Sequence, residues 1–159
     1  MKTIIIYSSK YGSTEDCAKH LKAGLSGSVS LVDIEKTNPK TIGLEKYDSI
    51  IFGSSIYVGS ISKKIRSLCN EFKELLLKKR IAIFICCGFP EQVNEYLSTN
   101  FSTKLLQNAV IVKSFGGEAR LDKMKALDRL IMKAATKGNH NNLKISQENI
   151  DDFIKAINS

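Results

Sequence analysis

The first apolar run of the chain is followed by a short loop whose residue types could hold an anion. The run covers residues 3–7 and the loop covers residues 8–14, where Gly12 permits a tight turn. Hydroxyl groups that can donate hydrogen bonds are carried by Ser9, Ser13 and Thr14. A helix that starts at the end of this loop adds unpaired backbone N–H groups and the positive end of its dipole. The composition therefore predicts an anion pocket directly after the first strand.

The same loop also fits an ordinary helix cap. In that interpretation Ser13 or Thr14 caps the helix, and the acidic side chains of residues 15 and 16 lie at the positive end of its dipole. Two nucleotide motifs are excluded, because the chain has no Gly-x-x-x-x-Gly-Lys-Ser/Thr sequence and Gly12 lacks the companions of a Gly-x-Gly-x-x-Gly turn. Spacing alone leaves the anion pocket and the plain cap as alternatives.

Short apolar runs alternate with segments of helical periodicity along the chain. The apolar runs, which we interpret as strands, are residues 3–7, 29–34, 49–53, 81–87 and 109–115. The helical segments are residues 14–25, 61–76, 91–106, 121–134 and 150–157. Such alternation predicts an α/β fold with a parallel sheet between layers of helices. Ligands of such sheets bind outside the carboxyl ends of the strands, where the loop of residues 8–14 is expected.

Size and composition fit a single domain that spans residues 1–159. Of these residues 43% are hydrophobic and 25% are charged, which is ordinary for a globular protein. No apolar run approaches the roughly 18 residues of a membrane span, and the N-terminal run is too short for a signal peptide. We therefore expect a cytoplasmic protein. The four cysteines lack Cys-x-x-Cys spacing and histidine neighbours at zinc spacing, so we expect reduced thiols and no metal site.

Residues 7–15, Tyr-Ser-Ser-Lys-Tyr-Gly-Ser-Thr-Glu, resemble the phosphate-binding signature of flavodoxins, which has a Thr/Ser-x-Thr-Gly-x-Thr core after the first strand. The match falls at Ser9, Gly12 and Thr14, whereas Tyr11 replaces the usual threonine. The order of elements is similar over nearly the whole chain. The resemblance implies a flavodoxin-like three-layer sandwich, with a five-stranded parallel sheet of order 2-1-3-4-5 and helices on both faces. It also implies flavin mononucleotide (FMN) as the cofactor.

By the same resemblance, three loops share the cofactor. The phosphate is expected at the first loop, on Ser9, Lys10, Tyr11, Gly12, Ser13 and Thr14. The flat isoalloxazine ring needs apolar walls and polar backbone along its edge. The second and third loops are expected to supply these with Ser54, Ser55, Ile56, Tyr57, Gly59, Cys87, Gly88 and Phe89. Gly59 stands where flavodoxins present a carbonyl to N5 of the reduced flavin. Without the resemblance, Tyr57 fits an ordinary surface loop, and Tyr96 is an alternative to Phe89 as the aromatic contact.

Two segments are more specifically similar to the short quinone-dependent protoporphyrinogen IX dehydrogenases of the flavodoxin family. They are residues 52–59, Phe-Gly-Ser-Ser-Ile-Tyr-Val-Gly, and residues 127–133, Leu-Asp-Arg-Leu-Ile-Met-Lys. This resemblance implies an oxidoreductase that oxidises protoporphyrinogen IX with a quinone as acceptor. The loop of residues 89–100 lacks the basic run of that group, and no side chain stands out as a general acid or base. An electron carrier between protein partners is the alternative function, and a flavin-free interaction domain is an alternative of another class.

The chain is basic, with 24 lysines and arginines against 16 acidic residues and a formal charge of +8. Four of the basic residues repeat every four positions, at Lys125, Arg129, Lys133 and Lys137. One face of the same predicted helix is traced by the apolar residues Leu121, Met124, Leu127, Leu130, Ile131 and Ala134. The basic stripe fits either a solvated flank or a docking surface for an acidic redox protein or the anionic inner face of a membrane. No pattern for binding nucleic acid is present.

Overall fold

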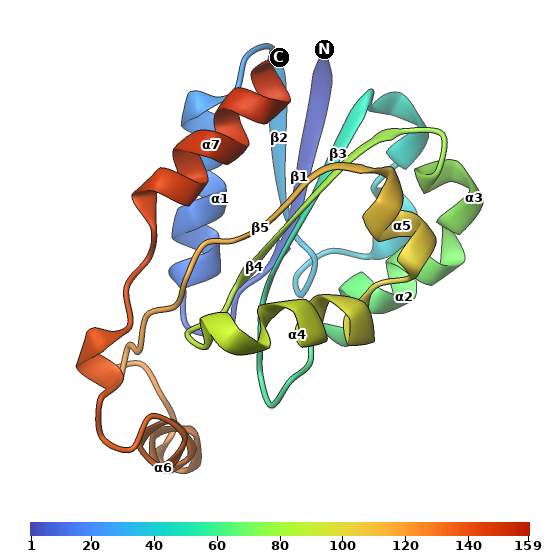
Figure 1. The fold of residues 1–159 in the computed structure, drawn as a ribbon. Coiled ribbons are helices and arrows are strands. Elements are labelled where there is room, and N and C mark those ends of the chain that lie inside the picture. The colour runs from blue at the N-terminus through green and yellow to red at the C-terminus, as the bar shows by residue number, and fades with distance from the viewer.

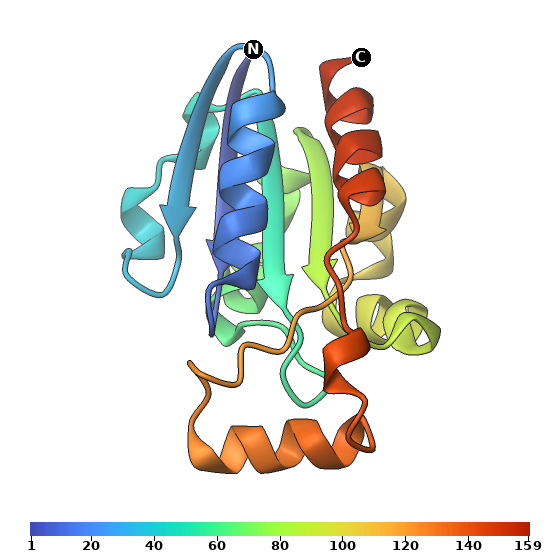
Figure 2. The ribbon, with the colours of Figure 1, turned by 90° about the vertical axis from the view of Figure 1, so that its left-hand side faces the viewer.

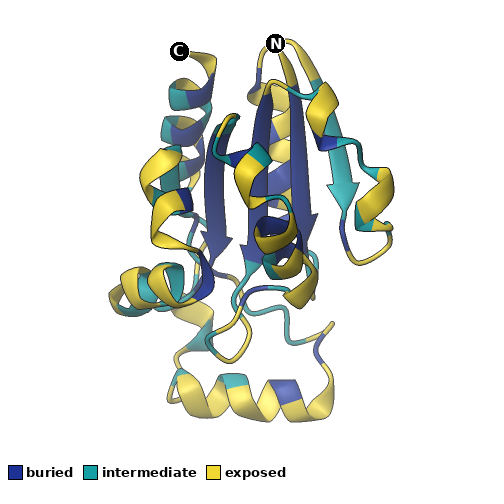
Figure 3. Cartoon of the chain, turned by 90° about the vertical axis from the view of Figure 1, so that its right-hand side faces the viewer, coloured by how far each residue is buried: buried dark blue, intermediate teal, exposed yellow.

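Five parallel strands form one sheet of order β2-β1-β3-β4-β5 in the computed structural model, which describes all 159 residues (Figure 1). The strands are β1 (Lys2–Ser8), β2 (Ser28–Asp33), β3 (Ser49–Ser55), β4 (Arg80–Cys86) and β5 (Ala109–Ser114). Nearly every residue of β1, β3 and β4 is buried, as continuous apolar runs covered on both faces require (Figure 3). The predicted fold class and strand order are confirmed.

Helices cover both faces of the sheet. On one face lie α1 (Ser13–Gly24) and α7 (Gln147–Asn158), and on the other lie α2 (Lys63–Glu71), α3 (Lys73–Leu76), α4 (Val93–Asn100) and α5 (Thr103–Asn108) (Figure 1). The remaining helix, α6 (Ala126–Ala135), lies on neither face and runs across the carboxyl ends of the strands (Figure 2). Single 3₁₀ turns occupy Pro39–Thr41, Leu44–Lys46, Pro90–Gln92 and His140–Asn142.

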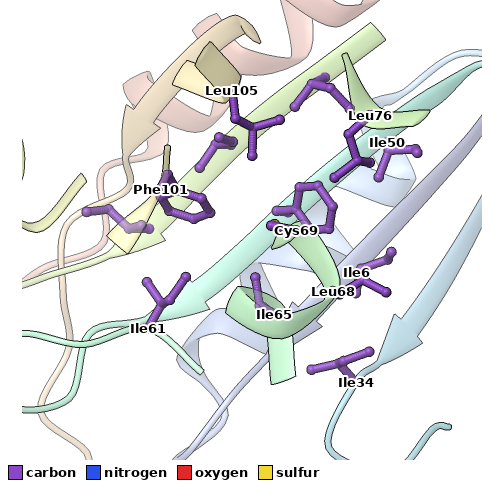
Figure 4. Close-up of a cluster of buried hydrophobic side chains, with 14 of the residues drawn as sticks. Ile6, Ile34, Ile50, Ile61, Ile65, Leu68, Cys69, Leu76, Phe101 and Leu105 are labelled. Carbon is purple, nitrogen blue, oxygen red and sulfur yellow. The ribbon is translucent and has the colours of Figure 1, made fainter. Parts of the chain in front are cut away.

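Successive strand residues point into two hydrophobic cores, one on each face of the sheet. In β1, Ile4 belongs to the core beneath α2, α3 and α5 (Figure 4), whereas Ile5 belongs to the core beneath α1 and α7. In the second core the rings of Phe84 and Phe115 stack with their centroids 4.6 Å apart. Gly53 makes room for this stack, because a Cβ atom there would lie 2.1 Å from Cζ of Phe84.

Two of the predicted helices are interrupted. Residues 61–76 form α2 and α3, which meet at Phe72, and residues 91–106 are broken between α4 and α5. At the second break Phe101 is extended and buried, and the hydroxyl of Ser102 caps α5 by accepting a hydrogen bond from Leu105 N–H at 3.3 Å. The helical periodicity continues through both breaks because the two fragments of each pair place apolar residues in the same core.

The segment predicted as a helix over residues 121–134 differs most from the structure. Helix α6 begins only at Ala126, and its side chains Leu127 and Leu130 are 68% and 66% exposed. The apolar face that the periodicity traces is therefore not buried at these two leucines. Asp128 is the buried residue of the helix. The physical reason is that the chain leaves the sheet after β5, so that α6 lies over the loops at the carboxyl ends of the strands instead of on a sheet face (Figure 2).

Candidate functional site

A cavity of about 560 Å³ opens at the carboxyl ends of the strands, beneath α6. Its walls come from the loops after β1, β3, β4 and β5 and from the inner side of α6. The volume lies within the range of small-molecule and cofactor pockets. The location agrees with the rule that open parallel sheets bind ligands outside the carboxyl ends of their strands.

One end of the cavity is formed by the loop before α1. Gly12 is the N-cap of α1, with φ at 97°, a value that glycine adopts readily and other residues rarely. The Gly12 N–H donates a hydrogen bond to Ser9 Oγ at 3.0 Å, which closes the loop. The predicted residues of this loop that line the cavity are Ser9, Lys10, Tyr11, Ser13 and Thr14, and Gly12 shapes the loop from outside that lining.

The Thr14 side chain presents an unsatisfied hydroxyl group at this end of the cavity. Thr14 is 1% exposed, its Oγ1 atom has no hydrogen-bond partner within the protein, and the residue lines the cavity. A buried hydroxyl without a partner is costly and uncommon. The first-turn N–H groups of α1 lie beside it. An anionic oxygen at this end of the cavity would bond to both.

A tight turn over residues 57–60 forms a second wall. Tyr57 N–H donates to Ser60 O at 2.9 Å, and Ser60 N–H donates to Tyr57 O at 3.0 Å. Both central residues have positive φ, at 47° for Val58 and 72° for Gly59. The carbonyl of Gly59, which the resemblance assigns to N5 of reduced flavin, accepts a hydrogen bond from Asn100 Nδ2 at 2.9 Å.

The other predicted residues of the second and third loops divide between the cavity and its support. The cavity is lined by Ser55, Ile56, Tyr57, Gly59, Cys87, Gly88 and Phe89, together with Tyr96. Ser54 lies outside the lining, and its hydroxyl donates to Ser55 O at 2.9 Å and accepts from Ser62 N–H at 3.1 Å. Ser54 therefore fixes the start of α2. Burial raises the pKa of the Cys87 thiol, so this residue is a neutral part of the wall.

A carboxylate that sequence reasoning did not single out joins α6 to the first two loops. Asp128 accepts hydrogen bonds from the hydroxyls of Tyr11 and Tyr57, the latter at 2.5 Å, and its carboxylate lies 2.9 Å from Lys10 Nζ. These bonds, with Tyr11 first, then Tyr57 and then Lys10, hold the pKa of Asp128 well below its usual range. Its only sequence signal is a charged residue between leucines of an amphipathic pattern.

Lys10 lies at the centre of this polar cluster. Its Nζ atom is 3.1 Å from the centroid of the Tyr57 ring, a cation–π contact, in addition to its ion pair with Asp128. Burial alone would lower the pKa of Lys10, but the hydrogen bonds to Asp128 and Tyr57 raise it above its ordinary value. Lys10 and Asp128 are therefore both charged at neutral pH. The cluster fastens α6 over the cavity and holds two aromatic rings in its wall.

The outer side of α6 is both apolar and basic. Leu127 and Leu130 are exposed on this side and do not line the cavity, whereas Tyr57, Val58 and Ile131 are exposed at the cavity mouth and also line it. Lys125, Arg129, Lys133 and Lys137 are exposed along the same segment. None of the helices is both long enough and apolar enough to cross a membrane. No group of three or more histidine, cysteine, aspartate or glutamate side chains is arranged to hold a metal ion.

Comparison with known sequences gives one family. A family model described as a flavodoxin domain matches residues 4–144. The uncharacterised protein MJ0298 of Methanocaldococcus jannaschii is 35% identical over 91 residues, which cover 57% of each chain. A flavodoxin of Clostridium saccharobutylicum is 32% identical over 85 residues, which cover 51% of this chain and 52% of that protein. The chain thus spans about half the length of the curated relatives that it matches.

Solved structures of similar fold include several flavodoxins. Flavodoxin 1 of Bacillus cereus superposes with a TM-score of 0.51 at 19% identity, over 91% of this chain and 100% of that one. The two-electron reduced flavodoxin of Megasphaera elsdenii gives 0.56 at 17% identity, over 70% and 84% of the two chains. A flavoprotein of Lactobacillus acidophilus in complex with FMN gives 0.54 at 19% identity, over 71% and 92%. These similarities confirm the flavodoxin-like fold.

Proposed function

This chain belongs to the flavodoxin domain family, and we propose that it binds FMN in the cavity beneath α6 and transfers electrons through the flavin. The observation that carries the proposal is the buried, unpartnered hydroxyl of Thr14, beside the N-terminus of α1 at one end of the cavity. A phosphate oxygen satisfies both groups. The FMN complex of the similar Lactobacillus acidophilus flavoprotein supports the choice of cofactor.

The residues that line the cavity divide the work of holding the cofactor. The loop of residues 9–14 binds the phosphate, with Ser9, Ser13 and Thr14 as hydroxyl donors. Tyr57 and Phe89 provide aromatic surface for the isoalloxazine, and α6 limits the access of water. Bound FMN supplies one- and two-electron transfer, whose potential the surrounding residues adjust. Because Asp128 is held in its ionised form, it orients its partners and does not act as a proton donor at neutral pH.

The finer proposal is an enzyme that oxidises protoporphyrinogen IX and passes the electrons to a quinone. Besides the sequence resemblance, it is supported by the apolar inner side of α6, where Ile131 and Met132 line the cavity and offer a surface to a large organic substrate. The alternative is a flavodoxin-type carrier between redox proteins. The carrier is favoured by the family itself.

The outer side of α6 suits a docking surface. Its exposed leucines and the basic residues Lys125, Arg129, Lys133 and Lys137 would meet either an acidic redox partner or the anionic face of a membrane that carries the quinone. Each basic side chain near an anionic lipid surface contributes about 1 kcal/mol. To match this surface, either partner needs an apolar centre surrounded by negative charge.

The proposal is tested by titrating the apoprotein with FMN and with riboflavin, which lacks the phosphate. Thr14→Val removes the unpartnered hydroxyl while keeping the shape of the side chain. It should lower the affinity for FMN and leave the affinity for riboflavin unchanged. Thr3→Val is the matched control, because Thr3 Oγ1 is also buried and unpartnered but lies in β1, away from the cavity. A purified protein that neither shows flavin absorption nor takes up FMN would instead be a flavin-free interaction domain.

The same preparation separates the enzyme from the carrier. The holoprotein is mixed with protoporphyrinogen IX and a soluble quinone, and the formation of porphyrin is followed by its fluorescence. Porphyrin formation that depends on both the protein and the quinone supports the dehydrogenase. A yellow protein that leaves the porphyrinogen unchanged points to a carrier, in which the flavin exchanges electrons with other proteins.

A further inference from the structure

Asn100, the last residue of α4, is buried beneath the turn that walls the cavity. It is 5% exposed, and both ends of its amide are used. Nδ2 donates to Gly59 O at 2.9 Å and to Tyr96 O at 2.8 Å. Oδ1 accepts from Ile61 N–H at 3.1 Å and from the guanidinium of Arg66. One side chain thus joins the turn to α4 and α2.

The partners leave only one orientation for this amide. Two carbonyls face its NH₂ group, and two N–H donors face its oxygen, so a flipped amide would meet like groups at all four contacts. The next residue, Phe101, is buried in the core beneath the helices. This anchor fixes the position of Asn100, and Asn100 in turn fixes the carbonyl of Gly59 and the N–H of Ile61.

The turn that Asn100 holds is one that its sequence disfavours. Turns with positive φ at both central positions are formed mainly by glycine, asparagine and aspartate. Here the first central residue is Val58, a β-branched residue at φ 47°, and it is 75% exposed. Such a conformation persists only where its surroundings impose it. Two of the four hydrogen bonds of Asn100, to Gly59 O and from Ile61 N–H, hold this turn from its buried side, and the other two, with Tyr96 and Arg66, hold Asn100 itself.

We propose that Asn100 is a positioning residue of the cofactor site, which holds the turn of residues 57–60 in its strained form and so sets the shape of the wall against the flavin. This role rests on the proposed binding of FMN. Asn100 also engages the carbonyl of Gly59, whereas the carbonyl of Val58 has no partner within the protein. Reduced flavin carries an N5–H donor that oxidised flavin lacks. A carbonyl without a partner at this wall can therefore strengthen the binding of reduced flavin more than that of oxidised flavin.

A double-mutant cycle tests this role. Asn100→Ala removes all four hydrogen bonds and should raise the dissociation constant of FMN on the order of tenfold, because binding must then restore the strained turn. Val58→Gly removes the strain, and the double variant should recover to within about threefold of wild type. Asn108→Ala is the matched control, since Asn108 also ends a helix and bonds a carbonyl, that of Lys79, but is exposed and lies away from the cavity.

Two further readouts test this role, and the first of them needs no FMN. In the apoprotein, Asn100→Ala should speed amide hydrogen exchange at Ser60 and Ile61 without changing exchange in the centre of β3. In the holoprotein, a tenfold difference between the affinity losses of oxidised and reduced FMN would move the two-electron midpoint potential by about 30 mV. The Asn108 variant should show neither effect.

Unchanged exchange at Ser60 and Ile61 in the Asn100 variant would overturn the inference, as would a double variant that binds FMN no better than Asn100→Ala alone. Failure of the proposed function has a different signature. A wild-type protein that binds no FMN would still show faster exchange at the turn when Asn100 is replaced, because that readout needs no cofactor.

Discussion

Replacing Gly12 by alanine tests the link between backbone conformation and phosphate binding at the first loop. Gly12 has φ at 97°, and an alanine in left-handed conformation costs about 1–2 kcal/mol. Its Cβ atom would also lie 2.8 Å from Arg120 Nη1. The flexible guanidinium can move, at the expense of ion pairs with Asp16 and Glu118 that are partly exposed and so contribute little.

The free protein can relieve this strain by letting the loop relax, and FMN must then restore it. A cost of about 1–2 kcal/mol corresponds to a dissociation constant roughly 5- to 30-fold higher. Titration of the apoprotein, followed by quenching of flavin fluorescence, measures the change. Riboflavin should lose less than about twofold, because it makes no phosphate contact with the loop.

Gly43→Ala is the control for strain alone. Gly43 also has positive φ, at 66°, but it precedes a 3₁₀ turn that does not line the cavity, and its added Cβ would meet only side-chain ends of Glu45 and Lys46. It should lower the melting temperature and leave the affinity for FMN unchanged. Equal losses of FMN and riboflavin binding in the Gly12 variant, or an equal loss of FMN in the Gly43 variant, would refute the reasoning.

Three further outcomes are expected. Asp128→Asn should make α6 more sensitive to limited proteolysis at neutral pH, and equal cleavage of the two proteins would contradict this. Because the pKa of Asp128 is lower in the folded protein, the carboxylate's contribution to stability in the wild type is complete above about pH 4, the usual pKa of an aspartate, and is lost as the pH falls further. The chain has no tryptophan, so Leu130→Trp introduces a single fluorescent reporter on α6. The fluorescence of this tryptophan should shift to the blue with phosphatidylglycerol vesicles but not with phosphatidylcholine vesicles, and that of Val110→Trp on β5 should shift with neither. The absence of a shift at position 130 would exclude contact between α6 and anionic lipid. Gly53→Ala, which places Cβ 2.1 Å from Phe84 Cζ, should lower the free energy of unfolding by about 1–3 kcal/mol in urea titration, and an unchanged midpoint would mean that the stack moves freely.

The sheet could be predicted from the sequence because each strand is marked by the residues of its own short segment. Each strand is a short apolar run, and covering on both faces makes the runs of β1, β3 and β4 continuous. The strand order came from the resemblance, whose signature lies in the loop before α1. The same resemblance picked out three loops of which nearly all the named residues line one cavity. Gly12 and Ser54 are the exceptions. For Ser54 the reason is that the side of the strand on which a residue lies depends on the exact end of the strand.

The position of α6 could not be predicted in the same way. Its periodicity marks a helix with an apolar side, but periodicity does not say what that side faces. Leu127 and Leu130 fit a core helix equally well, and only the path of the chain after β5 places them outside. The role of Asp128 depends on residues 71 and 117 positions away, at Tyr57 and Tyr11. Sequence patterns over a single helix carry no information at that distance.

The contacts of Asp128 have a thermodynamic consequence for the cavity. The helix α6 is fastened through Lys10 and Tyr11, which belong to the loop expected to hold the phosphate, and through Tyr57, which belongs to the expected flavin wall. A ligand that changes the position of these side chains changes the hold on α6, and a partner that binds α6 better in one of its positions would change the affinity for the ligand by the same factor. The proposed docking at the exposed leucines would therefore be coupled to retention of the cofactor, through the carboxylate of Asp128.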